Sequence, residues 1–152
     1  MAFLSGAKNL VAGDNNFVND VFVHDRDTGT TTRVSVGTDG TQASSGAGGP
    51  TISANGRFVL FSSGAALTEP DTNSTSDVFV HDLESRTTTR ISDSGTGAEG
   101  NNSSVASSIS SDGRYVAYES VASNLVPGDT NQMADVFVQD RTTELTTRIS
   151  LT

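Results

Sequence analysis

The hexapeptide Asp-Val-Phe-Val-His-Asp at residues 20–25 recurs at residues 77–82 and, with Gln in place of His, at residues 135–140. The three copies start 57 and 58 residues apart, and a Thr-rich segment follows each of them. That segment ends in Thr-Arg-Val-Ser or Thr-Arg-Ile-Ser, at residues 32–35, 89–92 and 147–150. Self-similarity at a fixed period indicates an array of similar structural units.

Each of the two complete repeats predicts four β-strands. A short strand of small residues, around 51–53 and 108–110, comes first and ends in a turn. Asn55-Gly56 and Asp112-Gly113 supply the positive φ that a tight hairpin turn needs. The second strand, at 58–62 or 115–119, is a near-continuous apolar run, which is typical of a strand covered on both faces. The hexapeptide is the third strand, and the Thr-Arg-Ile-Ser segment is the fourth.

Four antiparallel strands at a fixed repeat predict an all-β fold made of β-propeller blades. The segments between repeats, 36–50 and 93–107, are rich in Gly, Ser and Asn without helical periodicity and are expected to be loops. The first repeat begins after its inner strand, which leaves three strands there and four in each later repeat. We expect one domain over residues 1–152, with blades at 1–35 (partial), about 50–92 and about 107–150.

Three blades cannot close a ring, because propellers typically have about four to eight. Two interpretations remain. Two chains could associate around a two-fold axis to give six blades, or the chain could be part of a longer array. Exposed blade faces and edges favour a homo-oligomer, most simply a dimer, because they are a liability in a soluble monomer. The missing inner strand of the first blade counts against a symmetric dimer.

The composition excludes several classes of partner. A net charge of −9 and an isoelectric point near 4.4 argue against nucleic acid and anionic membranes, but leave cations and neutral glycans open. The chain has no Cys, so it has neither disulfides nor thiolate metal sites. Its apolar runs are too short for membrane insertion, and the start of the chain lacks the features of a signal peptide.

Several of these stretches resemble a known family. They are Ser-Ala-Asn-Gly-Arg-Phe-Val-Leu-Phe at 53–61, Ser-Ser-Asp-Gly-Arg-Tyr-Val-Ala-Tyr at 110–118, Asn-Leu-Val-Pro-Gly-Asp-Thr-Asn at 124–131, and the three hexapeptides. Together they resemble the TolB-like, or WD40-like (PD40), bacterial propeller repeats. The resemblance implies blades like those in accessory proteins, in secreted proteins and in propeller domains attached to peptidases. The resemblance and the acidic, Lys-poor composition imply an extracellular or periplasmic location, and the number of blades departs from the family pattern.

The pattern Asp-x-Asn-x-x-x-Asp occurs once per repeat, in the loop that leads into the hexapeptide. Its members are Asp14, Asn16 and Asp20; Asp71, Asn73 and Asp77; and Asp129, Asn131 and Asp135. Ca²⁺ takes about six to eight oxygen ligands, several of which such a loop could supply. The alternative is that these side chains cap and turn the loop by local hydrogen bonds. Ca²⁺ is the one cofactor that the sequence suggests.

No catalytic residue is predicted. His24 and His81 share one repeat position with Gln139, which indicates a hydrogen-bonding role rather than catalysis. The Gly-x-Gly-x-x-Gly pattern at 95–100 is not followed by a helix that could hold phosphate. No Gly-x-Ser-x-Gly elbow occurs, and the Asp residues of the hexapeptides recur in every blade, which suits strand-end capping better than glycosidase chemistry.

We therefore expect a non-catalytic binding or scaffold module that associates with itself and presents polar loops to a protein or glycan. Two alternatives stay open. One is the propeller part of a secreted hydrolase or lyase, and the other is a purely structural self-assembling protein. A unique acidic or His cluster in a central pocket would favour the enzyme, because chemistry needs one blade to differ from the others.

Overall fold

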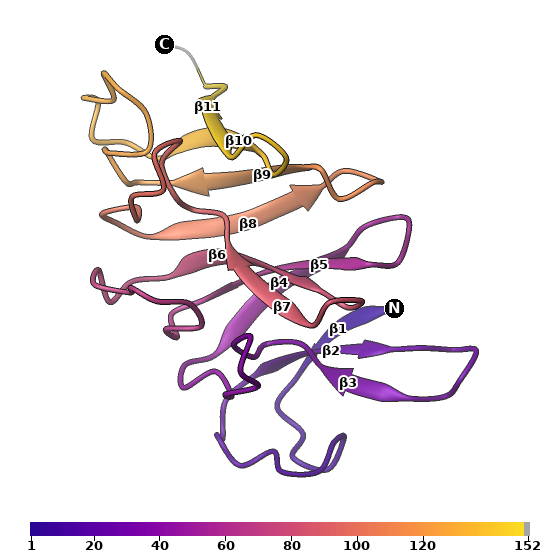
Figure 1. The fold of residues 1–152 in the computed structure, drawn as a ribbon. Coiled ribbons are helices and arrows are strands. Elements are labelled where there is room, and N and C mark those ends of the chain that lie inside the picture. Colours follow the sequence, from indigo (N-terminus) through magenta and orange to yellow (C-terminus); the bar gives the residue numbers. More distant parts are fainter. Residues whose placement is uncertain (151–152) are drawn as a thin grey trace.

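A computed structural model describes residues 1–150 as three antiparallel sheets stacked in chain order (Figure 1). Blade 1 contains β1 (Ala2–Ser5), β2 (Asp20–His24) and β3 (Thr31–Arg33). Blade 2 contains β4 (Ala47–Ile52), β5 (Phe58–Ser63), β6 (Asp77–Asp82) and β7 (Thr87–Arg90). Blade 3 contains β8 (Ser104–Ile109), β9 (Tyr115–Ser120), β10 (Asp135–Asp140) and β11 (Leu145–Arg148). In each blade, neighbouring strands in sequence are hydrogen-bonded neighbours in the sheet, which confirms the all-β fold of three repeated blades.

The inner strands are longer than the sequence predicts. β4 begins at Ala47 and β8 at Ser104, whereas the prediction placed these strands at 51–53 and 108–110. Both are irregular, with a register shift against β5 between Gly48 and Thr51, and a similar shift in β8. The Ala-Gly-Gly-Pro start of β4 has little intrinsic β-propensity, so its conformation comes from pairing with β5, and a proline is tolerated at a bulge.

Two apolar layers lie between the blades and form the core. Blade 1 packs on blade 2 through Val21, Val23 and Val34 against residues that include Val59 and Phe61. Blade 2 packs on blade 3 through the opposite face of its sheet, which is lined by Leu60, Val78, Val80 and Ile91. Successive β5 residues therefore enter different layers, and this explains the continuous apolar run.

The repeat also sets the internal packing and the turns. Each blade stacks one aromatic ring of its second strand on one of its third strand, with ring centroids 5.7 or 5.8 Å apart. Gly56 and Gly113 have φ of 74° and 79°, which confirms the predicted hairpin turns. Among residues 1–150 no helix is long and apolar enough to cross a membrane.

Candidate metal centre

One hydrogen-bonded frame recurs at the same end of every blade. The first Asp of the hexapeptide accepts a hydrogen bond from the Ser hydroxyl that closes the Thr-Arg-Ile-Ser segment. The same hydroxyl accepts a hydrogen bond from the backbone N–H that follows the Asp. The pairs are Ser35 with Asp20 (2.5 Å), Ser92 with Asp77 (2.7 Å) and Ser150 with Asp135 (2.5 Å). The recurrence of Asp and Ser in the sequence therefore reflects a structural joint between the third and fourth strands.

In blade 1 an arginine occupies the space between the two aspartates of the loop. The Nη1 atom of Arg33 lies 3.3 Å from Asp14 Oδ1 and 3.7 Å from Asp20 Oδ2. Asn16 Nδ2 donates to Asp20 Oδ2 at 2.8 Å, so both oxygens of this buried carboxylate have partners. Blade 1 thus pairs both loop carboxylates with its own guanidinium.

Blade 3 repeats this arrangement. Arg148 Nη1 lies 3.0 Å from Asp129 Oδ1 and 3.4 Å from Asp135 Oδ2. Asn131 Nδ2 donates to Asp135 Oδ2 at 2.9 Å. The hydrogen bond from Ser150 lowers the pKa of Asp135. Burial opposes this, but the hydrogen bond from Asn131 and the charge of Arg148 also lower the pKa, which stays below its ordinary value.

Blade 2 differs because its arginine has other partners. Arg90 Nε lies 2.6 Å from Asp93 Oδ1, and its Nη1 atom lies 3.0 Å from Glu99 Oε1. Blade 1 has Val36 and Gln42 at these two repeat positions, and the equivalent β-bridges align them with Asp93 and Glu99. The two extra carboxylates hold Arg90 away from the loop aspartates, which have no ion pair to it.

The result is a cluster of three acidic side chains in blade 2. Carboxylate oxygens of Asp71, Asp77 and Glu99 all lie within 4.8 Å of one another. Asp77 is 1% exposed, and its Oδ2 atom is buried without a hydrogen-bond partner. Asn73 Nδ2 donates to the backbone oxygen of Gly100 at 2.7 Å but not to Asp77, whereas Asn16 donates both to the backbone oxygen of Ala43 and to Asp20.

The electrostatics of the cluster follow from this geometry. Burial raises the pKa of Asp77 to about 6, although the Ser92 hydrogen bond and the Arg90 charge oppose the rise. Burial, followed by the charge of Glu99, also raises the pKa of Asp71. For Glu99 burial acts in the same direction, but hydrogen bonds from Thr72 outweigh it and leave the pKa below its ordinary value. Asp77 and Asp135 therefore shift in opposite directions from the same position in the repeat.

The structure places the nine predicted loop residues in two kinds of environment, one shared by blades 1 and 3 and the other found in blade 2. The loop asparagines also accept backbone N–H groups two residues ahead, as the capping interpretation expects. Only the loop of blade 2 gathers three carboxylates, among the residues described. The sequence pattern missed Glu99, which lies after the fourth strand. Aligning residues 93–99 with residues 36–42 would have revealed it.

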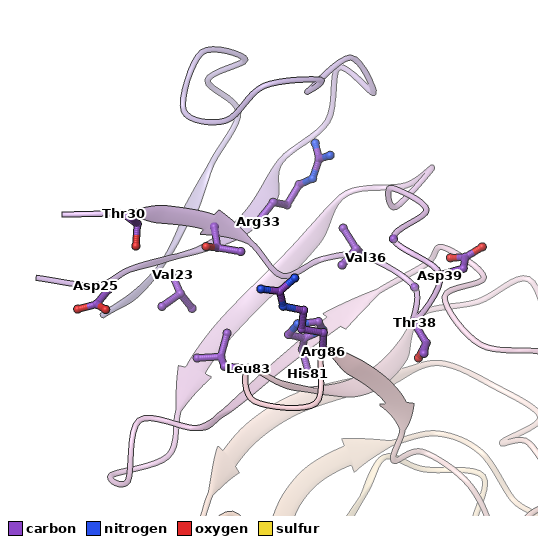
Figure 2. Close-up of a pocket in the computed structure, with 13 residues that line it drawn as sticks. Val23, Asp25, Thr30, Arg33, Val36, Thr38, Asp39, His81, Leu83 and Arg86 are labelled. Atoms are coloured by element: carbon purple, nitrogen blue, oxygen red, sulfur yellow. The ribbon is translucent and has the colours of Figure 1, made fainter. Parts of the chain in front are cut away.

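A second feature is an open cleft of about 760 Å³ between blades 1 and 2 (Figure 2). Val23 and Leu83 form its apolar wall, and His81 and Arg86 lie beside Leu83 in the close-up. His81 Nδ1 lies 2.9 Å from the Thr88 hydroxyl, and burial lowers the pKa of this imidazole. His81 therefore acts as a hydrogen-bonded scaffold residue.

The comparisons with known proteins concern the fold. No family model and no curated protein matches the sequence. A TolB-type protein from Agrobacterium tumefaciens aligns with a TM-score of 0.52 and 18% identity, over 88% of this chain and 42% of its own. The β-propeller domain of the trilobed protease from Pyrococcus furiosus aligns with a TM-score of 0.48 and 16% identity, over 85% of this chain and 33% of its own. The chain therefore has a TolB-like propeller fold and spans less than half the length of that TolB structure.

Proposed function

We propose that this TolB-like propeller segment is a non-catalytic binding and scaffold module that associates with a second copy of itself. One observation supports the proposed association of two chains. The outward face of blade 3 is an apolar blade face, and within residues 1–150 no blade packs against it (Figure 1). Its residues are the repeat counterparts of residues that lie buried between blades 2 and 3.

The counterparts differ in exposure. Ile91 is 1% exposed in blade 2, whereas Ile149 at the same repeat position is 55% exposed. Val78 is fully buried, whereas Val136 is 38% exposed. Tyr115 of blade 3 is also exposed. An apolar patch of this kind on a soluble protein is typical of an interaction site.

Blade 1 offers a complementary surface at the other end of the stack. Phe3 and Leu10 stand at the repeat positions of Tyr118 and Leu125, which receive the face of blade 2. In two chains related by a two-fold axis, blade 3 of each chain can pack on blade 1 of the other. That arrangement closes a ring of six blades, a number common among propellers.

The recognition part of the proposal rests on the cleft between blades 1 and 2. It combines an apolar wall with hydroxyl, carboxylate and guanidinium groups, a mixture that suits a peptide or glycan. Among residues 1–150, Arg86 makes no salt bridge and is therefore available to a ligand. We place this module outside the cytoplasm, in the periplasm or beyond the cell, and the acidic, Lys-poor composition supports this.

Light scattering on a size-exclusion peak tests the association. We expect a mass near twice 15.7 kDa for the native chain. Ile149→Asp introduces a charge into the proposed interface and should return the mass to that of one chain. Met133→Asp is the control, because Met133 is 67% exposed in a loop of the same blade and outside the apolar face. A native chain that remains monomeric at high micromolar concentration contradicts the proposal.

The non-catalytic part has its own test. We expect no hydrolysis or elimination when the purified chain is incubated with polysaccharide, glycoside, peptide and ester substrates. A hydrolytic or lyase activity that disappears on changing one Asp or Ser would overturn this part of the proposal and favour the enzyme. The mass measurement would be unaffected by that outcome, so the two parts can fail separately.

A further inference from the structure

We propose that blade 2 binds one divalent cation, with the ligand chemistry of Ca²⁺, between the carboxylates of Asp71, Asp77 and Glu99. Oxygens of the three side chains lie within 4.8 Å of one another. No other three acidic or histidine side chains within residues 1–150 come this close together. Among residues 1–150 this grouping occurs in blade 2 alone, although the loop pattern occurs in all three blades.

The buried oxygen of Asp77 is an observation independent of the clustering of charge. Asp77 Oδ1 accepts a hydrogen bond from Ser92, but Oδ2 has no partner although the residue is almost completely buried. A buried carboxylate oxygen without a partner is costly, because it has lost water and gained nothing in exchange. The equivalent oxygens of Asp20 and Asp135 accept hydrogen bonds from asparagines. A bound cation would supply the partner that Asp77 lacks.

The charge balance of blade 2 also differs from that of blade 1. Blade 1 places two carboxylates, Asp14 and Asp20, around one guanidinium. Blade 2 has four carboxylates and one guanidinium in this region, because Asp93 and Glu99 pair with Arg90 and the two loop aspartates lie beside Glu99. The formal excess of negative charge is therefore one in blade 1 and three in blade 2. A divalent cation would bring blade 2 to the same balance as blade 1.

The ligand set selects the kind of metal. All three side chains offer oxygen, which favours a hard cation over Zn²⁺ or Cu²⁺. Ca²⁺ binds oxygens at about 2.3–2.6 Å, so ligands on opposite sides of the ion stand about 5 Å apart. For Mg²⁺ the corresponding separation is about 4 Å. Oxygens within 4.8 Å of one another in blade 2 can reach one such cation, and water would complete the coordination.

Calorimetric titration of CaCl₂ into the chelator-treated full chain tests the proposal, with MgCl₂ in parallel. We expect one Ca²⁺ per chain and weaker binding of Mg²⁺. At about 100 times the dissociation constant, Ca²⁺ should raise the melting temperature by about 5–10 °C. Absence of both heat and a melting shift with millimolar CaCl₂ would refute the site.

Matched variants locate the site. Asp77→Asn keeps the shape of the side chain and should abolish binding, whereas Asp135→Asn at the same position of blade 3 should leave it unchanged. Glu99→Gln installs the residue that blade 1 carries at Gln42, so the fold tolerates it in that context, and affinity should fall about tenfold or more. Ca²⁺ binding that survives in both Asp77→Asn and Glu99→Gln would place the ion elsewhere and overturn the proposal.

Discussion

Gly56 and Gly113 occupy the same turn position in blades 2 and 3. Comparing the stability cost of alanine at the two positions measures a contact between these blades. Both have positive φ, at 74° and 79°, so an alanine is strained by the backbone at either position. They differ in surroundings. A Cβ added to Gly113 would lie 2.0 Å from Phe58 Cδ2, whereas a Cβ on Gly56 would meet no heavy atom within 4 Å. We predict that Gly113→Ala destabilises the protein more than Gly56→Ala.

The magnitudes follow from two contributions. Alanine in the left-handed region costs about 1–2 kcal/mol, offset by about 0.4–1 kcal/mol because the unfolded chain becomes less flexible. Gly56→Ala should therefore cost about 1 kcal/mol. Gly113→Ala must also displace the ring of Phe58, which packs on the apolar layer between the blades and lies 4.4 Å below the Arg141 guanidinium. Losing part of the roughly 1.5–3 kcal/mol of a buried aromatic ring brings the total to about 2–3 kcal/mol.

Urea unfolding followed by circular dichroism, at one protein concentration, measures both costs. The decisive comparison repeats the two substitutions in a Phe58→Ala background. Without the ring the two glycine positions should become equivalent, and the excess cost of Gly113→Ala should disappear. If the excess persists without Phe58, or is within about 0.5 kcal/mol of zero in the native background, the contact does not explain the need for glycine at 113.

Two further predictions concern polar contacts. Ser35→Ala removes the donor to Asp20 and the acceptor for the Val21 N–H, both in a buried frame. The free energy of unfolding in urea should fall by about 2–5 kcal/mol. A fall below about 1 kcal/mol would mean that water replaces the hydroxyl. Arg57→Ala removes the fork to Asp82, and should cost less than about 1 kcal/mol at pH 7 because the arginine is 43% exposed. Hydrogen bonds from Arg57 hold the pKa of Asp82 well below its usual range, so this stabilisation is present above about pH 4 and is lost as the pH falls further. The stability difference between Arg57→Ala and the native protein should shrink under acid conditions, and a constant difference from pH 7 to pH 2 would exclude the ion pair as its cause.

The architecture was predictable because the information is repeated in the sequence. The hexapeptides, the Asn-Gly and Asp-Gly turns and the Thr-Arg-Ile-Ser segments predicted the number of strands in each blade. The extent of β4 and β8 was not predictable. Ala47 and Gly48 have little preference for a strand and extend β4 by pairing with β5, whereas Pro50 lies in the irregularity between Gly48 and Thr51. Local β-propensity does not predict the bounds of a strand whose conformation depends on pairing with its partner strand.

For the candidate site, repetition limits what the sequence can predict. Asp-x-Asn-x-x-x-Asp is identical in the three loops, so the pattern alone predicts either three cation sites or none. Blade 2 is distinguished by the ion pairs of Arg90. Within residues 1–150 this arginine pairs with Asp93 and Glu99 and not with the loop aspartates. Those carboxylates lie outside the pattern, after the fourth strand, in a segment that composition identifies only as a loop. The difference between blades therefore appears only when the residues that follow the repeat are aligned as well.

The asymmetry of blade 2 bears on catalysis, because a unique acidic cluster in a central pocket would favour an enzyme. The cluster of Asp71, Asp77 and Glu99 is unique among residues 1–150, but Asp77 is buried. Glu99 lines an open groove beside the segment that joins blade 2 to blade 3, whereas Asp77 is not among the residues that line it. A general acid or nucleophile must reach its substrate within hydrogen-bonding distance, and Asp77 is only 1% exposed. The three carboxylates support the proposed structural cation, which would tie the loop of blade 2, with Asp71 and Asp77, to the connection leading into blade 3, with Glu99.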